Sequence, residues 1–190
     1  MSLLACTKMS IIIQQDHKMN LTIALHRGWI YTGAIGSMHK MDPAYISSDI
    51  ALVSHLSSDY TLPIIFSGEF ASSLSWDILY ECREVDKIMW NNMVVSIYAF
   101  DLDLKILSKS ILNNKWQELS RNRAKINTMQ KRANDDDWNS SKYLQGEADI
   151  TKTRKKFTKG RRDWYDKFYQ HYINGRWQDG VDLYNMKMFP

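Results

Sequence analysis

"TLPIIFSGEFASSLSWDILYECREVDKIMWNNMVVSIYAF" spans residues 61–100, and this stretch determines the predicted fold class. Its two ends, residues 61–68 and 93–100, are rich in β-branched and aromatic residues and predict strands. Apolar side chains recur every three or four positions between them, which predicts one amphipathic helix. These apolar residues are Leu74, Ile78, Cys82, Val85 and Met89. Strands that cluster before and after a single helix indicate an α+β fold rather than a doubly wound sheet.

The flanking segments extend this pattern. Residues 21–36, "LTIALHRGWIYTGAIG", predict two strands that form a hairpin around Gly28. Residues 49–56 predict a further strand, and residues 36–48 between them predict an exposed loop. Residues 102–107 alternate apolar and charged side chains, which predicts a strand with one buried face. The sequence therefore predicts antiparallel strands packed with helices, followed by a basic helical C-terminal arm.

The chain divides by composition into four parts. Residues 1–18 are an N-terminal extension, and residues 19–133 are the α+β body, whose last predicted helix covers residues 114–133. Residues 134–150 are acidic and aperiodic, which is typical of a linker. Residues 151–190 form the basic, aromatic, helical arm. We expect its helix to be broken near Gly160 and to end at Asn174-Gly175.

Positive charge is concentrated in this arm. The whole chain has a net charge of +4, whereas residues 151–176 hold nine Lys or Arg and two Asp, a net charge of +7. A dense local cluster of one sign produces the field that attracts a polyanion. We therefore predict that the arm binds nucleic acid or an acidic protein surface, and that the chain forms homo- or hetero-oligomers.

Two kinds of side chain carry this prediction. Basic residues would contact phosphates or carboxylates, which position a partner without reading its sequence. Aromatic residues at helical spacing would pack on protein or stack on bases, and together with the charge they favour a binding arm docked by its apolar side. The predicted binding residues are Lys152, Arg154, Lys155, Lys156, Lys159, Arg161, Arg162, Trp164 and Tyr165. Phe168, Tyr169 and Tyr172 complete the aromatic stripe.

Residues 22–36, "TIALHRGWIYTGAIG", and residues 64–81, "IIFSGEFASSLSWDILYE", carry a family resemblance. They resemble the opening hairpin, and the turn into the first long helix, of the proteasome β subunit and bacterial HslV. The resemblance covers about residues 19–105 and implies an Ntn-hydrolase fold. That family uses a mature N-terminal Thr as nucleophile, and Thr22 is the matching position. Here 21 residues precede Thr22, and the family's acidic residue and Lys are missing, so the resemblance implies a scaffold without activity.

Two enzymatic alternatives stay open at this point. One is a hydrolase on the Ntn-type scaffold. The other is a metal-dependent nuclease, because Asp103-Leu104-Lys105 is an acid-x-Lys triplet like those that hold Mg²⁺ and orient water. The nearest further acids are Glu81 and Glu84. The triplet is also what the exposed face of a half-buried strand would contain.

The leading hypothesis is a non-enzymatic binding or assembly protein, and an alternative is a structural subunit of a larger assembly, such as a viral one. The spacing of the histidines and cysteines predicts no metal site, no cofactor is expected, and no catalytic residue is assigned. Cys6 and Cys82 are expected to be reduced thiols. No run of 18 apolar residues predicts a membrane span. The expected location is the cytoplasm, either of a cell or of a virus-infected host, or the virion.

Overall fold

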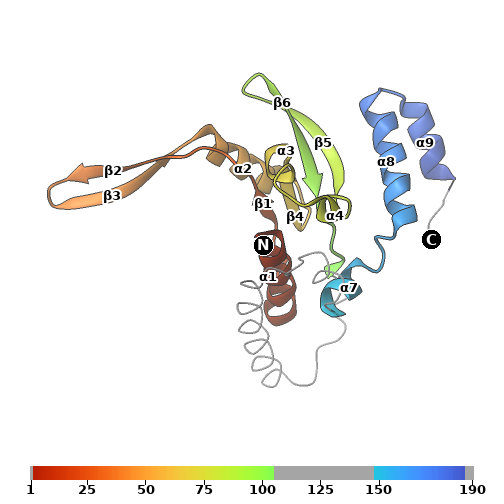
Figure 1. Cartoon of the computed structure of the whole chain (residues 1–190), viewed down its shortest axis with the longest axis horizontal. Coiled ribbons are helices and arrows are strands. Elements are labelled where there is room, and N and C mark those ends of the chain that lie inside the picture. The colour runs from red at the N-terminus through yellow and green to blue at the C-terminus, as the bar shows by residue number, and fades with distance from the viewer. Residues whose placement is uncertain (1, 105–147, 187–190) are drawn as a thin grey trace.

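The computed structural model describes residues 2–104 and 148–186, which fold as the predicted α+β class. Four strands make the main sheet, and Figure 1 shows helices around it. In spatial order they are β1 (Ile23–Leu25), β4 (Ile64–Ser67), β6 (Met93–Ala99) and β5 (Arg83–Trp90). β1 is parallel to β4, and the other two pairs are antiparallel. The strands predicted at residues 61–68 and 93–100 are confirmed.

Strand β4 is the centre of the packing. Its residues Ile64, Ile65 and Phe66 are fully buried, as expected for an interior strand that is covered on both faces. Ile64 and Phe66 belong to one hydrophobic cluster, and Ile65 belongs to a second. Helix α1 (Ser2–His17) contributes to the first cluster, and helix α2 (Ser48–Asp59) contributes to the second. Because side chains alternate along a strand, β4 joins the two cores of the molecule.

The strand predicted at residues 49–56 is wrong, since these residues lie in α2. Ser47 caps this helix, and its hydroxyl accepts a hydrogen bond from the backbone N–H of Asp49. Leu52 and Leu56, four residues apart, are its two buried side chains. Leu52 and Leu56 would lie on one face in a strand as well as in a helix, so the apolar pattern does not distinguish the two. The capping residue Ser47 is the signal that indicates the helix.

The single helix predicted between residues 72 and 90 is also wrong. The chain makes two short helices, α3 (Gly68–Ala71) and α4 (Trp76–Leu79), and then enters β5. Asn91 and Asn92 both have positive φ, at 49° and 61°, which is the geometry of a two-residue hairpin turn between β5 and β6. The turn places residues 83–90 beside β6, so pairing across the hairpin prevails over their helical periodicity.

The predicted hairpin around Gly28 is wrong as well, because β1 pairs with β4 instead. The next strand, β2 (Tyr31–Ser37), pairs with β3 (Lys40–Ile46), which covers most of the segment predicted as a loop. That segment is largely exposed, as predicted. The β2–β3 hairpin forms its own two-stranded sheet and projects from the rest of the molecule (Figure 1).

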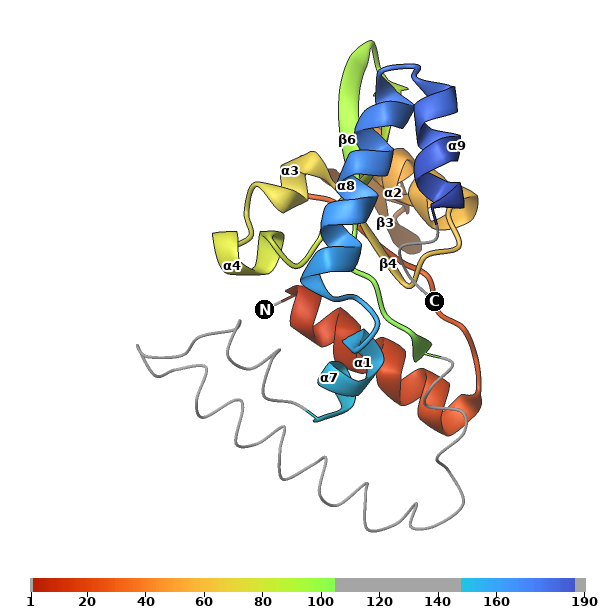
Figure 2. The ribbon, with the colours of Figure 1, turned by 90° about the vertical axis from the view of Figure 1, so that its right-hand side faces the viewer.

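Residues 148–186 contain three helices: α7 (Ala148–Arg154), α8 (Lys159–Ile173) and α9 (Trp177–Asn185). The break lies at residues 155–158, and Gly160 is inside α8, because Thr158 caps α8 by accepting a hydrogen bond from the backbone N–H of Arg161. The predicted stop is confirmed: Asn174 ends α8, and Gly175 adopts φ of 66°. Figure 2 shows α8 alongside the sheet and α9 folded back on α8.

Other predicted segments lie wholly or partly outside the described residues. These are the helix at residues 114–133, most of the linker, and the end of the strand at residues 102–107. The last three linker residues, 148–150, begin α7 instead. Leu102 and Leu104 are buried as predicted, although they form no strand.

The predicted N-terminal extension, the end of the predicted linker and the start of the arm all contact the body. Leu3, Leu4 and Ile11 of α1 and Ile150 of α7 share one core cluster with Phe66. Ile150 is fully buried, and the backbone N–H of Asp103 donates a hydrogen bond to the carbonyl of Thr153 in the same helix. The division into a body and a separate arm stays a prediction, but α7 has the contacts of a core element.

Replacing Ile150 with Ala tests this division. We expect the free energy of unfolding to fall by about 2–5 kcal/mol, because the change leaves a cavity in the core that α1, β4 and α7 share. The exposed neighbour Lys152 is the matched control, and Lys152→Ala should change stability by no more than about 0.5 kcal/mol. Urea unfolding measures both. An arm that folds separately from the body would leave the main transition of Ile150→Ala unchanged.

Candidate binding site on the C-terminal helices

Two of the predicted binding residues point into the molecule. Arg154 Nη2 and Arg162 Nη1 lie 2.8 Å and 2.7 Å from the same carboxylate oxygen, Oε2 of Glu81. Arg154 also donates hydrogen bonds to the backbone carbonyls of Glu81, at 2.8 Å, and Asp101, at 3.2 Å. Both guanidinium groups are therefore used to fasten α7 and α8 to the body.

The surroundings of Arg154 are those of a buried cation. Its guanidinium carbon lies 3.9 Å from the centre of the Phe100 ring, which is a close cation–π contact. Burial lowers the pKa of Arg154, and the charge and hydrogen bond of Glu81 oppose that effect. Burial also raises the pKa of the nearby Cys82 thiol to about 12, so this thiol stays protonated at neutral pH.

Other predicted cations face outward. Lys152, Lys155 and Lys159 are exposed, and none of them makes an ion pair with another described residue. Lys156 reaches Asp103 at 2.8 Å, but 60% of its side chain remains exposed. Arg161 lies beside two rings of its own segment, those of Phe157 and Tyr165. The charge run therefore divides into Arg154 and Arg162, which point inward, and the lysines and Arg161, which do not.

The aromatic residues pack on protein. Trp164 stacks on Phe168, with ring centres 5.7 Å apart, and its indole N–H donates a hydrogen bond to the backbone carbonyl of Leu183 at 3.4 Å in α9. The Tyr165 ring lies 4.7 Å from the guanidinium carbon of Arg83 on β5. These contacts place Trp164 between α8 and α9, and Tyr165 between α8 and the sheet. The stripe was predicted either to pack on protein or to stack on bases, and the contacts of Trp164 and Tyr165 are packing contacts with protein.

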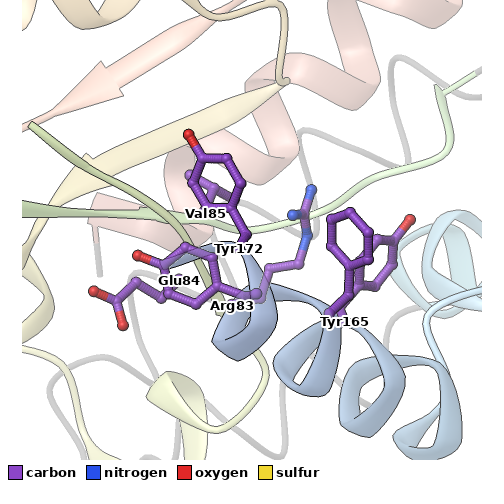
Figure 3. Close-up of a pocket in the computed structure, with 7 residues that line it drawn as sticks. Arg83, Glu84, Val85, Tyr165 and Tyr172 are labelled. Carbon is purple, nitrogen blue, oxygen red and sulfur yellow. The ribbon is translucent and has the colours of Figure 1, made fainter. Parts of the chain in front are cut away.

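A cavity of about 200 Å³ lies between α8 and strand β5. The stripe residues Tyr165, Phe168, Tyr169 and Tyr172 line it from the helix, and Arg83, Glu84 and Val85 line it from the strand. The β5–β6 register shifts between Glu84 and Asp86, which marks a β-bulge at the cavity. Figure 3 shows the Arg83 side chain running between Tyr172 and Tyr165. Sequence reasoning missed Glu84 and Arg83 here, because it assigned both to a helix.

A second polar cluster lies at the root of the hairpin. Ser67 Oγ is 2.7 Å from Nδ1 of His26, and Asp49 Oδ1 is 3.6 Å from the other ring nitrogen. Asp49 also accepts a hydrogen bond from the backbone N–H of Trp29 at 2.7 Å. Gly28 is required here, since a Cβ at this position would lie 2.0 Å from Asp49 Oδ2.

This cluster has the residue types of a hydrolase triad, but Ser67 is fully buried and only 7% of the His26 side chain is exposed. In this structure a substrate would not reach the hydroxyl. The cluster instead connects β4, the start of α2 and the chain that enters β2, so it holds the base of the projecting hairpin. The sequence signal, Ser67 followed by Gly68, lacks a nucleophile-elbow frame, and His26 is 41 residues away along the chain.

The residues of the enzymatic alternatives are placed as follows. Thr22 is half-buried immediately before β1. Asp103 is occupied by its ion pair with Lys156, and Lys105 lies outside the described residues. Within residues 2–104 and 148–186, no group of three or more His, Cys, Asp or Glu side chains is arranged to hold a metal ion.

Comparisons with known proteins identify no relative of this chain. No family model matches the chain, and neither a curated protein nor a solved structure does. The resemblance to the proteasome β subunit and HslV therefore stays a prediction. In the part of the chain that the structure describes, no helix is both long enough and apolar enough to cross a membrane.

Replacing Glu81 with Ala tests the inward role of the two arginines. We expect the free energy of unfolding to fall by about 2–4 kcal/mol, because Arg154 and Arg162 would lose their shared acceptor in a mostly buried place. Asp77→Ala, at an exposed acid on α4, is the matched control and should be close to neutral. Thermal and urea unfolding measure the effect. Equal stability of the two variants would contradict the fastening role.

Proposed function

We propose that this protein is a non-enzymatic assembly and binding protein. The β2–β3 hairpin would join a second copy of the chain, and the outward lysines of residues 152–159 would bind an anionic surface. The observation that carries the first part is the exposure of the hairpin. Its uncovered large apolar side chains are Trp29, Ile30, Tyr31, Ile35, Met38, Met41, Tyr45 and Ile46.

The exposure of these side chains is large. Tyr31 is 77% exposed, Ile35 is 65% exposed and Met38 is 93% exposed. Soluble monomers rarely expose a contiguous apolar surface of this kind without using it for interaction. A two-stranded hairpin is also only marginally stable by itself in water, so a partner that covers it would stabilise its strands.

Both faces of the hairpin carry apolar side chains. Tyr31 lies opposite Ile46 on one face, and Thr32 lies opposite Tyr45 on the other. A hairpin that packed on its own body would have one apolar face and one polar face. This hairpin has no such polar face, which favours a partner that surrounds it.

The backbone of the hairpin supports a second copy as that partner. In the described chain β2 pairs only with β3, so each strand has an outer edge with unpaired N–H and C=O groups. Two identical hairpins can pair edge to edge around a twofold axis, which satisfies the same groups on both copies. The apolar side chains of each paired hairpin would then pack against the second copy of the chain.

Charged substitutions in the hairpin test this proposal. The full chain should sediment as a dimer or larger species above its monomer mass of 22.3 kDa, and Tyr45→Lys or Ile35→Lys should shift it to monomer. The reason is that a buried lysine at such an interface is costly. Analytical ultracentrifugation across a range of concentrations is the measurement.

The matched control is Ser58→Lys, at an exposed serine on α2, which should leave the mass unchanged. A wild-type chain that stays monomeric at about 100 μM, far above the Kd of a stable complex, would contradict self-assembly through the hairpin.

A second candidate function, binding of nucleic acid or an acidic protein surface, is favoured by the outward lysines. Lys152, Lys155 and Lys159 lie within eight residues of chain, and Lys156 among them keeps most of its side chain exposed. Lysines that lack an internal carboxylate partner can neutralise a phosphate or carboxylate of another molecule. Arg154 and Arg162 are not part of this surface, because Glu81 holds them inside.

A salt titration tests the second candidate. If three or four lysines touch duplex phosphates, the logarithm of affinity should fall with the logarithm of salt concentration at a slope of about −3. The combined variant Lys152→Glu, Lys155→Glu, Lys159→Glu should abolish binding at physiological salt, whereas Lys40→Glu on the hairpin should have little effect.

Outcomes of the titration separate the partners. Binding of an acidic peptide without binding of DNA or RNA would assign the surface to a protein. No binding to either class at about 50 mM salt would contradict the anion-binding function.

The proposal extends to location and to the enzymatic alternatives. We place the protein in the cytoplasm, or in a virion if its source is viral, where the free thiols of Cys6 and Cys82 would stay reduced. No hydrolase or nuclease is proposed, since Ser67 is buried and Asp103 is engaged by Lys156.

A further inference from the structure

We propose that the cavity between α8 and β5 binds a small organic ammonium group, the chemistry of a primary or methylated alkylamine. This inference does not depend on the assembly or anion-binding functions, because it concerns the inner side of α8. It is carried by three observations: the aromatic walls, a carboxylate at a β-bulge, and the cavity's size.

The aromatic walls come from one face of α8. Tyr165, Phe168, Tyr169 and Tyr172 are spaced at three, four and seven residues from the first, so they project toward the same side. Tyr172 is held in turn by Trp177 of α9, whose ring meets it edge-on at 5.4 Å. Four aromatic rings therefore line the cavity, and aromatic rings attract organic cations to their faces.

Glu84 supplies the negative charge. Glu84 lies at the β-bulge and lines the cavity, and its Oε1 is shielded from solvent without a hydrogen-bond partner among the described residues. Lys87 Nζ forms an ion pair with this oxygen at 3.9 Å, a distance that is too long for a hydrogen bond. A shielded carboxylate of this kind is stabilised when an ammonium group supplies charge and hydrogen bonds.

The hydroxyl of Tyr169, which also lines the cavity, is influenced by the charge of Glu84. Tyr169 is 8% exposed, and burial followed by the charges of Glu84 and Asp86 raises the pKa of its hydroxyl. The charge of Glu84 therefore acts on the Tyr169 hydroxyl, and it would oppose an anionic ligand at this end of the cavity.

Arg83 does not reverse this field. Its Nε and Nη2 donate to the carboxylate of Asp101 at 2.6 Å and 3.1 Å, so its charge is compensated, and its guanidinium lies over Tyr165. In Figure 3 the guanidinium of Arg83 and the carboxylate of Glu84 point in opposite directions. The ligand's ammonium group would lie toward the Glu84 end of the cavity, beside the stacked rings of Tyr169 and Tyr172.

The size of the cavity limits the ligand. At roughly 30 Å³ for each non-hydrogen atom, which is the liquid share of a water molecule, a cavity of about 200 Å³ holds about seven such atoms. Drug-sized ligands and whole nucleotides need about 300–1,000 Å³. The site therefore fits a head group or the end of a side chain, and choline is a probe of matching size.

The experiment compares choline with 3,3-dimethyl-1-butanol, which has the same shape but carbon in place of the charged nitrogen. Both are titrated into the full chain, and backbone amide shifts in β5 and α8 report binding by NMR. We expect choline to bind with a Kd of about 1 mM or tighter and the neutral isostere to bind at least about tenfold more weakly, because only the cation interacts with the carboxylate and the ring faces.

Two variants sharpen the test. Glu84→Gln keeps the shape but removes the charge, and should weaken choline binding by about tenfold or more while leaving the isostere unchanged. Asp77→Asn makes the same charge change at an exposed acid away from the cavity and should have no effect.

The proposal would be overturned by equal affinity for the two ligands in the unmodified chain, by no choline binding at about 10 mM, ten times the expected Kd, or by unchanged binding in Glu84→Gln. The comparison of the two ligands needs no variant, so it holds even if Glu84→Gln folds poorly.

Discussion

The complete burial of strand β4 is the constraint on which the rest of the structure depends. Ile64 and Phe66 need cover on one face, and Ile65 needs cover on the other. Helices α1 and α7 provide the first cover, and α2 provides the second. Because α1 begins the described chain and α7 begins its second part, segments far apart in sequence must meet before the first core is complete. The two cores then hold β4 as the rigid centre from which the hairpin and the C-terminal helices extend.

Glu81 decides how the C-terminal charge is used. One carboxylate oxygen of Glu81 accepts hydrogen bonds from both Arg154 and Arg162. Two cations of the basic segment therefore stabilise the fold and do not contact a partner. The lysines between and before them have long flexible side chains that remain in water. This division is physically reasonable, because a planar guanidinium satisfies several acceptors when buried, whereas an ammonium group is strongly hydrated and costs more to bury. Charge density in the sequence therefore overstates the surface that a polyanion could contact.

The hairpin and the cavity are both candidate binding surfaces, but they suit partners of different size. The hairpin exposes apolar side chains and unpaired strand edges, which a large partner would cover. The cavity is lined by aromatic rings and by Glu84, one of whose carboxylate oxygens is shielded from solvent, and its size admits only a small group. The His26 cluster fixes the root of the hairpin to β4 and α2, so the orientation of the first surface is set by the same strand that organises the core. The second surface depends on α8, which Arg162 ties to the body.

The sequence by itself determined the α+β class, the strands at residues 61–68 and 93–100, and the end of the helix at Asn174-Gly175, because these depend on local composition and on glycine's freedom at positive φ. It also showed where positive charge is concentrated. Tertiary structure decided the rest. Residues 83–90 have helical spacing but become a strand because Asn91 and Asn92 turn them onto β6, and residues 49–56 become a helix because Ser47 caps them above the apolar surface of β4. Glu81 decided that Arg154 and Arg162 point inward, and the packing of α8 beside β5 formed the cavity. Both bring together side chains about 80 residues apart, a separation that no local pattern records.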